Sequence, residues 1–157
     1  LELLITMPVR DWEVVVGKFL AAFGLIVAIV AATGVYALTV ASVGDLDKGP
    51  AFAGYVSLTL MGGAYAAIGV MASAFTRNQI VAFILAFGIS FGLFIFGSIV
   101  QVMPEALQPL VAFLAIGEHL QSMARGVIDT RDVLYYLSII AVCLVVATVT
   151  LESRKWR

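Results

Sequence analysis

The run NQIVAFILAFGISFGLFIFGSIVQVMP, residues 78–104, contains no aspartate, glutamate, lysine, arginine or histidine. A helix of about 20 apolar residues crosses the hydrocarbon core of a bilayer, which is roughly 30 Å thick. Inside that core backbone polar groups must be hydrogen-bonded within the protein, so only helices and closed barrels cross it. The run is too long and too uniformly apolar for the alternating strands of a barrel. It therefore predicts a transmembrane helix.

The composition of the whole chain supports a membrane protein. Of its 157 residues, 62% are hydrophobic and 12% are charged, whereas an ordinary soluble domain has about 25% charged residues. The mean hydropathy is +1.09, and the formal net charge of −1 leaves no basic surface for nucleic acid. These values exclude a soluble enzyme, a disordered tail and a nucleic-acid binder, and they indicate the lipid bilayer as the surroundings of the chain.

Three more stretches without charged residues lie at 19–44, 49–76 and 133–151. We predict an all-α membrane protein with one transmembrane domain over residues 1–157 and four spans, at about 14–43, 51–76, 78–103 and 132–151. The shorter uncharged stretch 106–117 carries Gln108 and Pro109. It predicts an interfacial or re-entrant helix within an extracytoplasmic helical segment at 104–130.

The basic residues predict the orientation. With a cytoplasmic N-terminus, the short inner segments hold Arg10, Lys18, Arg77, Arg154, Lys155 and Arg157, and the outer ones hold Lys48, Arg125 and Arg131. The excess on the inner side agrees with the positive-inside rule. We therefore expect both ends of this multi-pass chain in the cytoplasm.

Several residues predict where the helices begin and end. Asp11 and Glu13 are expected to supply the N-terminal cap and first-turn charge of the first span. Gly49 and Pro50 are expected to break the chain in the first outer turn. The sequence TRN at 76–78 predicts a tight inner turn, and DTRD at 129–132 is expected to cap the last span.

Small residues recur at helical spacing and predict close helix packing. In the second span the stripe is Gly62, Ala66, Gly69 and Ser73, and in the third span Gly88 and Gly92 form a GxxxG pair. Such stripes let helix backbones approach one another in a membrane.

Residues with chemistry to offer are few. The chain has no phosphate-binding loop, no GxSxG and no HExxH, so we expect no catalytic residue, no bound metal and no cofactor. The single histidine, His119, follows Glu118, and we expect these two to form a solvated or capping pair. The uncharged runs hold no ionisable group for a coupling ion. Tyr65 and Thr59 are candidates for a substrate path, although the Tyr65 hydroxyl could instead bond to a neighbouring helix.

Three motifs resemble one family. LELLITMPVRDWEVVVGKFLAA (1–22), SAFTRNQIVAFILAF (73–87) and ARGVIDTRDVLYYLS (124–138), the last followed by LESRKWR (151–157), are similar to ABC-2 type permeases, the membrane subunits of ATP-binding-cassette transporters. They look most like the gliding-motility-associated branch, which is also kin to permeases encoded with nitrous-oxide reductase maturation genes.

The resemblance implies a six-helix plasma-membrane subunit that dimerises, with itself or with a homologous permease, and pairs with separate ATPase subunits. It places Glu2, Leu3, Leu4 and Arg10 in the cytoplasmic coupling segment 1–10 that docks on the ATPase. The four spans would be helices three to six, with the first two helices preceding residue 1, and 105–125 would form the outer interfacial helices, a helical hairpin before the last span. A non-transporting membrane scaffold or assembly protein, and an intramembrane enzyme, are the alternatives.

Overall fold

The computed structural model describes residues 10–100, 104 and 107–155. Within these residues the chain is helical and has no strand. The helices are α1 (Asp11–Val43), α2 (Lys48–Phe75), α3 (Gln79–Ile99), α4 (Gln108–Leu114), α5 (Ile116–Ala124) and α6 (Thr130–Lys155). Four of them are long and apolar enough to cross a membrane, namely α1, α2, α3 and the Thr130–Ser153 part of α6. The predicted all-α fold with four transmembrane helices is confirmed.

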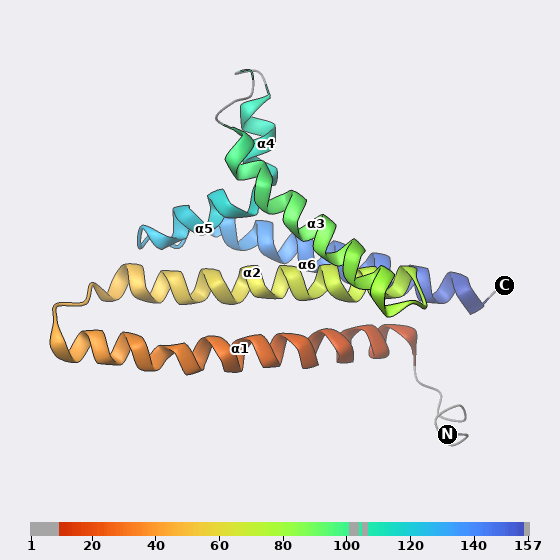
Figure 1. Cartoon of the computed structure of the whole chain (residues 1–157), viewed down its shortest axis with the longest axis horizontal. Helices are drawn as coiled ribbons and strands as arrows, with labels where there is room; N and C mark the ends of the chain where they lie inside the picture. The colour runs from red at the N-terminus through yellow and green to blue at the C-terminus, as the bar shows by residue number, and fades with distance from the viewer. Residues whose placement is uncertain (1–9, 101–103, 105–106, 156–157) are drawn as a thin grey trace.

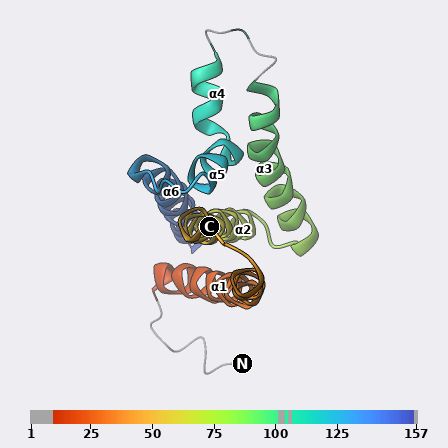
Figure 2. The ribbon, with the colours of Figure 1, turned by 90° about the vertical axis from the view of Figure 1, so that its left-hand side faces the viewer.

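Helix α2 is the centre of the bundle, because it packs against α1, α3, α5 and α6. Figure 1 shows α1, α2 and α6 running lengthwise, with α3 rising obliquely from the end of α2. Figure 2 shows α5 above α2, between α3 and α6. The start of α1, the turn from α2 to α3 and the end of α6 share one end of the molecule (Figure 1), which we call the Arg10 end. The region covered by α5 is called the α5 end.

Small side chains let α6 approach α2 closely. The buried residues of α2 are mostly small, and they are Ala53, Ser57, Gly63, Ala64, Ala67, Ile68, Ala72 and Ala74. In a membrane, small interface residues allow the dispersion contacts that hold helices together. Tyr136 and Ala147 of α6 are fully buried. The core therefore follows the side of α2 that is rich in alanine.

Only part of the predicted small-residue stripe of α2 lies at a contact with another helix. A Cβ at Gly62 would lie 2.6 Å from Cγ2 of Ile26, so α1 and α2 do approach closely there. Gly69, Gly88 and Gly92 have no such neighbour within 4 Å, and Ser73 is exposed. Of the predicted stripe, Gly62 and Ala66 therefore pack within the described part of the chain, whereas Gly69, Ser73 and the GxxxG pair of α3 do not.

The starts of the first two helices differ from expectation. Arg10, and not Asp11, is the N-cap of α1, and its backbone N–H donates a 3.1 Å hydrogen bond to Glu13 Oε2. Helix α2 begins before Gly49 and Pro50 and is capped by Asp47, whose Oδ1 accepts from Gly49 N–H at 3.2 Å. Proline is tolerated in a first helical turn because the N–H that it lacks would have no intrahelical partner.

The predicted turn at 76–78 lies between α2 and α3, and Asn78 Oδ1 caps α3 by accepting from Ile80 N–H at 2.9 Å. At the start of α6 the capping oxygen belongs to Asp129, which accepts from Arg131 N–H at 2.9 Å. Asp132 is buried instead of capping.

Two short helices occupy the segment where outer interfacial helices are predicted. Helices α4 and α5 meet at Ala115, which is fully buried. Gly126, after α5, has φ +94°, and a Cβ there would lie 3.0 Å from Cγ of Pro50. This close approach holds the α5–α6 connection against the start of α2.

Large apolar side chains cover the outer faces of α1 and α3. Helix α1 buries only Val15 and Phe19, and the described part of α3 buries none. On α3, Phe83, Phe87 and Phe91 stack with ring centroids 6.2 and 5.4 Å apart. Apolar surface this extensive needs a nonaqueous neighbour, as hydrocarbon tails provide.

Candidate functional site

Of the predicted coupling segment 1–10, the structure describes only the last residue. Glu2, Leu3 and Leu4 lie outside the described residues, whereas Arg10 is exposed at the start of α1. Glu13 Oε2 accepts from Arg10 N–H, and Glu13 N–H donates to the carbonyl oxygen of Arg10 at 2.9 Å, so this residue is tied to the first helical turn. Residue 10 is therefore joined to α1 without an intervening loop.

The start of α1 packs against the ends of two other spans. Val15 of α1, Ala74 of α2 and Ala147 of α6 form one buried cluster, with Leu144 and Leu151 packed against it. Beside it an apolar cleft of about 350 Å³ separates α1 from α6, and it is lined by Trp12, Val16, Leu144, Val145, Thr148, Val149 and Glu152. The Arg10 end thus connects α1 directly to α2 and α6.

Thr59, a candidate for the substrate path, lines a shallow cleft of about 280 Å³ with Tyr55, Val56 and Leu60. Its hydroxyl donates to the carbonyl oxygen of Tyr55 at 2.9 Å, within the same helix. The Tyr55 hydroxyl in turn donates to the carbonyl oxygen of Thr33 at 2.8 Å, across to α1. A tyrosine of α2 thus bonds to a neighbouring helix, as was considered for Tyr65, but the tyrosine is Tyr55.

Tyr65, the other candidate, does not line the Thr59 cleft. It is partly buried and packs against the cluster around Tyr136 and against that around Ile68. Six residues along a helix of 3.6 residues per turn place Thr59 and Tyr65 on different faces. The structure does not bring the two candidates together.

The α5 end contains a buried polar pair where a solvated one is predicted. His119 Nδ1 lies 2.7 Å from Asp132 Oδ1, and His119 Nε2 lies 3.0 Å from the carbonyl oxygen of Phe113. His119 and Asp132 are 8% and 5% exposed. The expected solvated pair with Glu118 is therefore wrong. Neighbouring residues on a helix point about 100° apart, and Glu118 is on the exposed side of α5.

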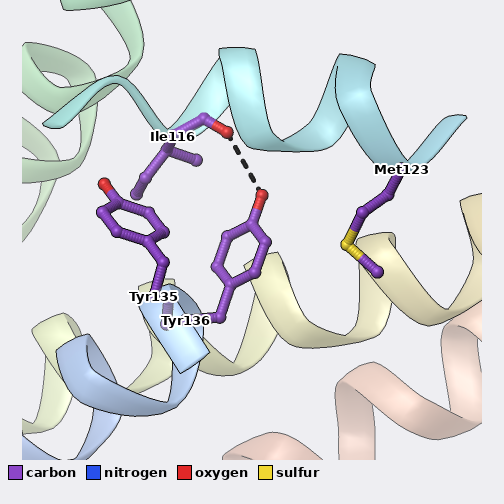
Figure 3. Close-up of a cluster of buried hydrophobic side chains, with 5 residues drawn as sticks. Ile116, Met123, Tyr135 and Tyr136 are labelled. Carbon is purple, nitrogen blue, oxygen red and sulfur yellow. Dashed lines mark hydrogen bonds between the residues drawn. The ribbon is translucent and has the colours of Figure 1, made fainter. Parts of the chain in front are cut away.

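Two tyrosines of α6 hold the segment that contains His119. Tyr135 O–H donates to the carbonyl oxygen of Leu114 at 2.7 Å, and Tyr136 O–H donates to that of Ile116 at 3.1 Å (Figure 3). These carbonyls flank the α4–α5 junction, and that of Leu114, at the end of α4, has no acceptor role within its own helix. The ring of Tyr135 also stacks on His119, with centroids 4.0 Å apart.

A sequence signal for this group existed. A lone histidine and an aspartate at the head of an apolar helix are both costly to bury unless they are paired. Tyr135 and Tyr136, at the start of the last span, also suit an aromatic belt at the membrane interface, and nothing in the sequence shows that α4 and α5 fold back onto α6.

A second feature of the α5 end is a polar recess between α3 and α5. It measures about 200 Å³ and is lined by Phe94, Gly97, Ser98, Gly117, Glu118 and Gln121. No group of three or more histidine, cysteine, aspartate or glutamate side chains that could hold a metal occurs in the part of the chain that the structure describes.

Comparison with known proteins gives one match. Residues 1–156 match the family model described as ABC-2 family transporter protein. No curated protein and no solved structure matches the chain.

Proposed function

The chain belongs to the ABC-2 family of transporter proteins, and we propose that two copies, or this chain and a homologous permease, form a substrate pathway driven by separate ATPase subunits. The observation that carries this proposal is the family match over nearly the whole chain. The four apolar helices support it, because they fit a membrane-spanning permease. The motifs quoted from 1–22, 73–87 and 124–138 favour the gliding-motility-associated branch.

The proposed location is the plasma membrane, with the Arg10 end in the cytoplasm. Arg77 lies in the α2–α3 turn, and Arg154 and Lys155 lie at the end of α6. Both of these segments belong to the Arg10 end (Figure 1). The positive-inside rule supports this orientation. The α5 end, including the polar recess, then faces the extracytoplasmic side.

Residues 1–10 are proposed to carry force from the ATPase. Glu2, Leu3 and Leu4 would dock on the ATPase, and Arg10 would pass the displacement into α1. From there the path runs through the contact of Val15 with Ala74 and Ala147. Because this contact joins three spans, a displacement of α1 acts on α2 and α6 together.

Charge reversal in the full-length protein tests the docking step. Glu2→Lys and Leu4→Asp should reduce co-purification of the ATPase and substrate-stimulated ATP hydrolysis. Asp45→Lys is the control, because Asp45 is an exposed acidic residue in the turn between α1 and α2. Lipid anchoring of residues 1–10 would instead tolerate a lysine at position 2, since basic residues are attracted to anionic headgroups. Complexes with wild-type ATPase content in both variants would refute the coupling assignment and favour a membrane scaffold.

A second experiment tests the force path inside the bundle. Ala147→Leu adds bulk at a fully buried position between α1, α2 and α6, whereas Val145→Leu changes a side chain that is 61% exposed. Ala147→Leu should keep the ATPase bound but uncouple hydrolysis from transport. Coupled transport in Ala147→Leu would show that the force takes another route.

The substrate path through Tyr65 and Thr59 stays a proposal. Thr59 opens onto a cleft on the outer face of α2, so it is the better placed of the two to face a second copy. Thr59→Cys should form a cross-link between two copies, and Val35→Cys, on an exposed part of α1, should not. Cross-linking at Val35 alone would move the pathway to another face.

A further inference from the structure

The hydrogen-bond partners of His119 and Asp132 determine how many protons the pair carries. The carbonyl oxygen of Phe113 can only accept, so His119 Nε2 must carry a hydrogen for its 3.0 Å contact. Nδ1 and Asp132 Oδ1, 2.7 Å apart, need one more hydrogen between them. The two contacts together therefore require two protons on the pair, either as imidazolium with carboxylate or as neutral imidazole with carboxylic acid.

Removal of one proton breaks one of these contacts. If the hydrogen between Nδ1 and Oδ1 leaves to water or a buffer base, a nitrogen lone pair faces a carboxylate oxygen. If the imidazole then moves its remaining hydrogen to Nδ1, the lone pair of Nε2 faces the Phe113 carbonyl instead. Neither tautomer satisfies both neighbours.

The surroundings add to the cost of the deprotonated state. The two-proton pair is neutral as a whole, whereas the one-proton pair buries a negative charge, which is expensive. Asp132 Oδ2 is buried without a hydrogen-bond partner among the described residues, so the carboxylate has no second donor to stabilise it.

No other charge of the surrounding helices compensates the pair. The side chains that face it are the rings of Phe113 in α4 and of Tyr135 and Tyr136 in α6. From α2, Ser57 and Tyr65 lie next to Tyr136. Helices α3 and α4 carry no charged residue, and α2 has only Lys48, at its first position. Glu118 of α5 and Arg131 of α6 are exposed.

We propose that His119 and Asp132 form a buried proton-binding site that latches α4 and α5 onto α6. The site links three helices, because Phe113 belongs to α4, His119 to α5 and Asp132 to α6. With the proton bound, all three are joined. Loss of the proton breaks one of these bonds and leaves α5 held at the head of α6 by the Tyr135 and Tyr136 bonds, so that α5 separates more often and exposes the cluster beneath it.

A cysteine introduced under α5 can report whether α5 separates from the helices beneath it. Met123 of α5 is fully buried in the cluster with Tyr136, and its neighbour Ala124 is exposed. In the full-length protein with Cys143→Ala, single cysteines at 123 and 124 are labelled with a maleimide in detergent micelles. The ratio of the two labelling rates cancels the pH dependence of the thiol itself.

The ratio should be low in acidic buffer and rise about tenfold in basic buffer, because the bond that breaks on loss of the proton involves a charged group. Asp132→Asn is the decisive variant. Its amide can donate to Nδ1 while Nε2–H still donates to Phe113, so the latch keeps both bonds without the titrating proton. The ratio in Asp132→Asn should stay low and independent of pH.

His119→Ala removes both bonds and should give a high ratio at every pH. A wild-type ratio that does not change with pH would overturn the proposal, and so would an Asp132→Asn ratio that follows the wild-type profile. Neither readout depends on transport or on an ATPase, so the latch and the proposed function can fail separately.

Discussion

The hydroxyl of Tyr55 donates a 2.8 Å hydrogen bond to the carbonyl oxygen of Thr33 and so joins α2 to the second half of α1. The buried residues of α1, Val15 and Phe19, both lie near its start. This bond therefore holds a part of α1 that has no buried apolar side chain of its own.

Tyr55→Phe should lower the free energy of unfolding by about 1 kcal/mol, the usual net value of such a bond. The measurement is unfolding of the protein in mixed detergent micelles. Tyr36→Phe is the control, because the Tyr36 side chain is 74% exposed on α1. An equal loss in both variants would show that the cost arises from losing a hydroxyl group in general and not from this bond.

Gly62 and Gly69 should respond differently to the same substitution. Gly62→Leu pushes into Ile26, whose Cγ2 lies 2.6 Å from the position of an added Cβ, so we expect a loss of about 1–3 kcal/mol from overpacking. Gly69→Leu meets no atom within 4 Å at that Cβ, and stability should be unchanged or slightly higher because leucine is the better helix former. A large loss in Gly69→Leu would place a further helix against that face.

Gly126→Ala should destabilise the connection between α5 and α6. The backbone at φ +94° disfavours a side chain, and the added Cβ would lie 3.0 Å from Pro50 Cγ. We expect a loss of about 1–2 kcal/mol. Gly117→Ala, in α5 with no neighbour within 4 Å, is the matched control and should gain up to about 1 kcal/mol. Equal stability of the two variants would contradict the assigned backbone geometry.

Single exposed cysteines at 45, 77, 118 and 153 test the orientation. In intact cells an impermeant reagent should label positions 45 and 118 and leave 77 and 153 unlabelled, because the latter lie on the side with more basic residues. Permeabilised cells provide the control for reactivity. Labelling at 77 in intact cells would reverse the proposed topology.

The transmembrane helices were predictable because their causes are local. An apolar run such as 78–104 and a cap such as Asn78 act on their own segment, whatever the rest of the chain does. The start of α2 was misjudged because Gly49 and Pro50 were interpreted as a break, although proline is also favourable in a first helical turn.

The polar contacts at the α5 end were not predictable in the same way. His119 and Asp132 meet because α5 returns to the head of α6, which the sequence does not show locally. The choice of Gly62 over Gly69 as a contact likewise depends on where Ile26 of α1 lies. Spacing indicates which residues share a helix face, but the neighbouring helix decides which part of that face is covered.

The place of α5 between α3 and α6 limits how these two helices can move toward each other. Helix α5 rests on α2 and contacts both flanking spans, so it acts as a wedge that keeps the tops of α3 and α6 apart. Those two helices cannot converge at this end while α5 is in place, because side chains such as Ile116 and Met123 fill the space beneath it. Departure of α5 must come first and convergence second, so a step that narrows this end of the bundle cannot run faster than the wedge is withdrawn.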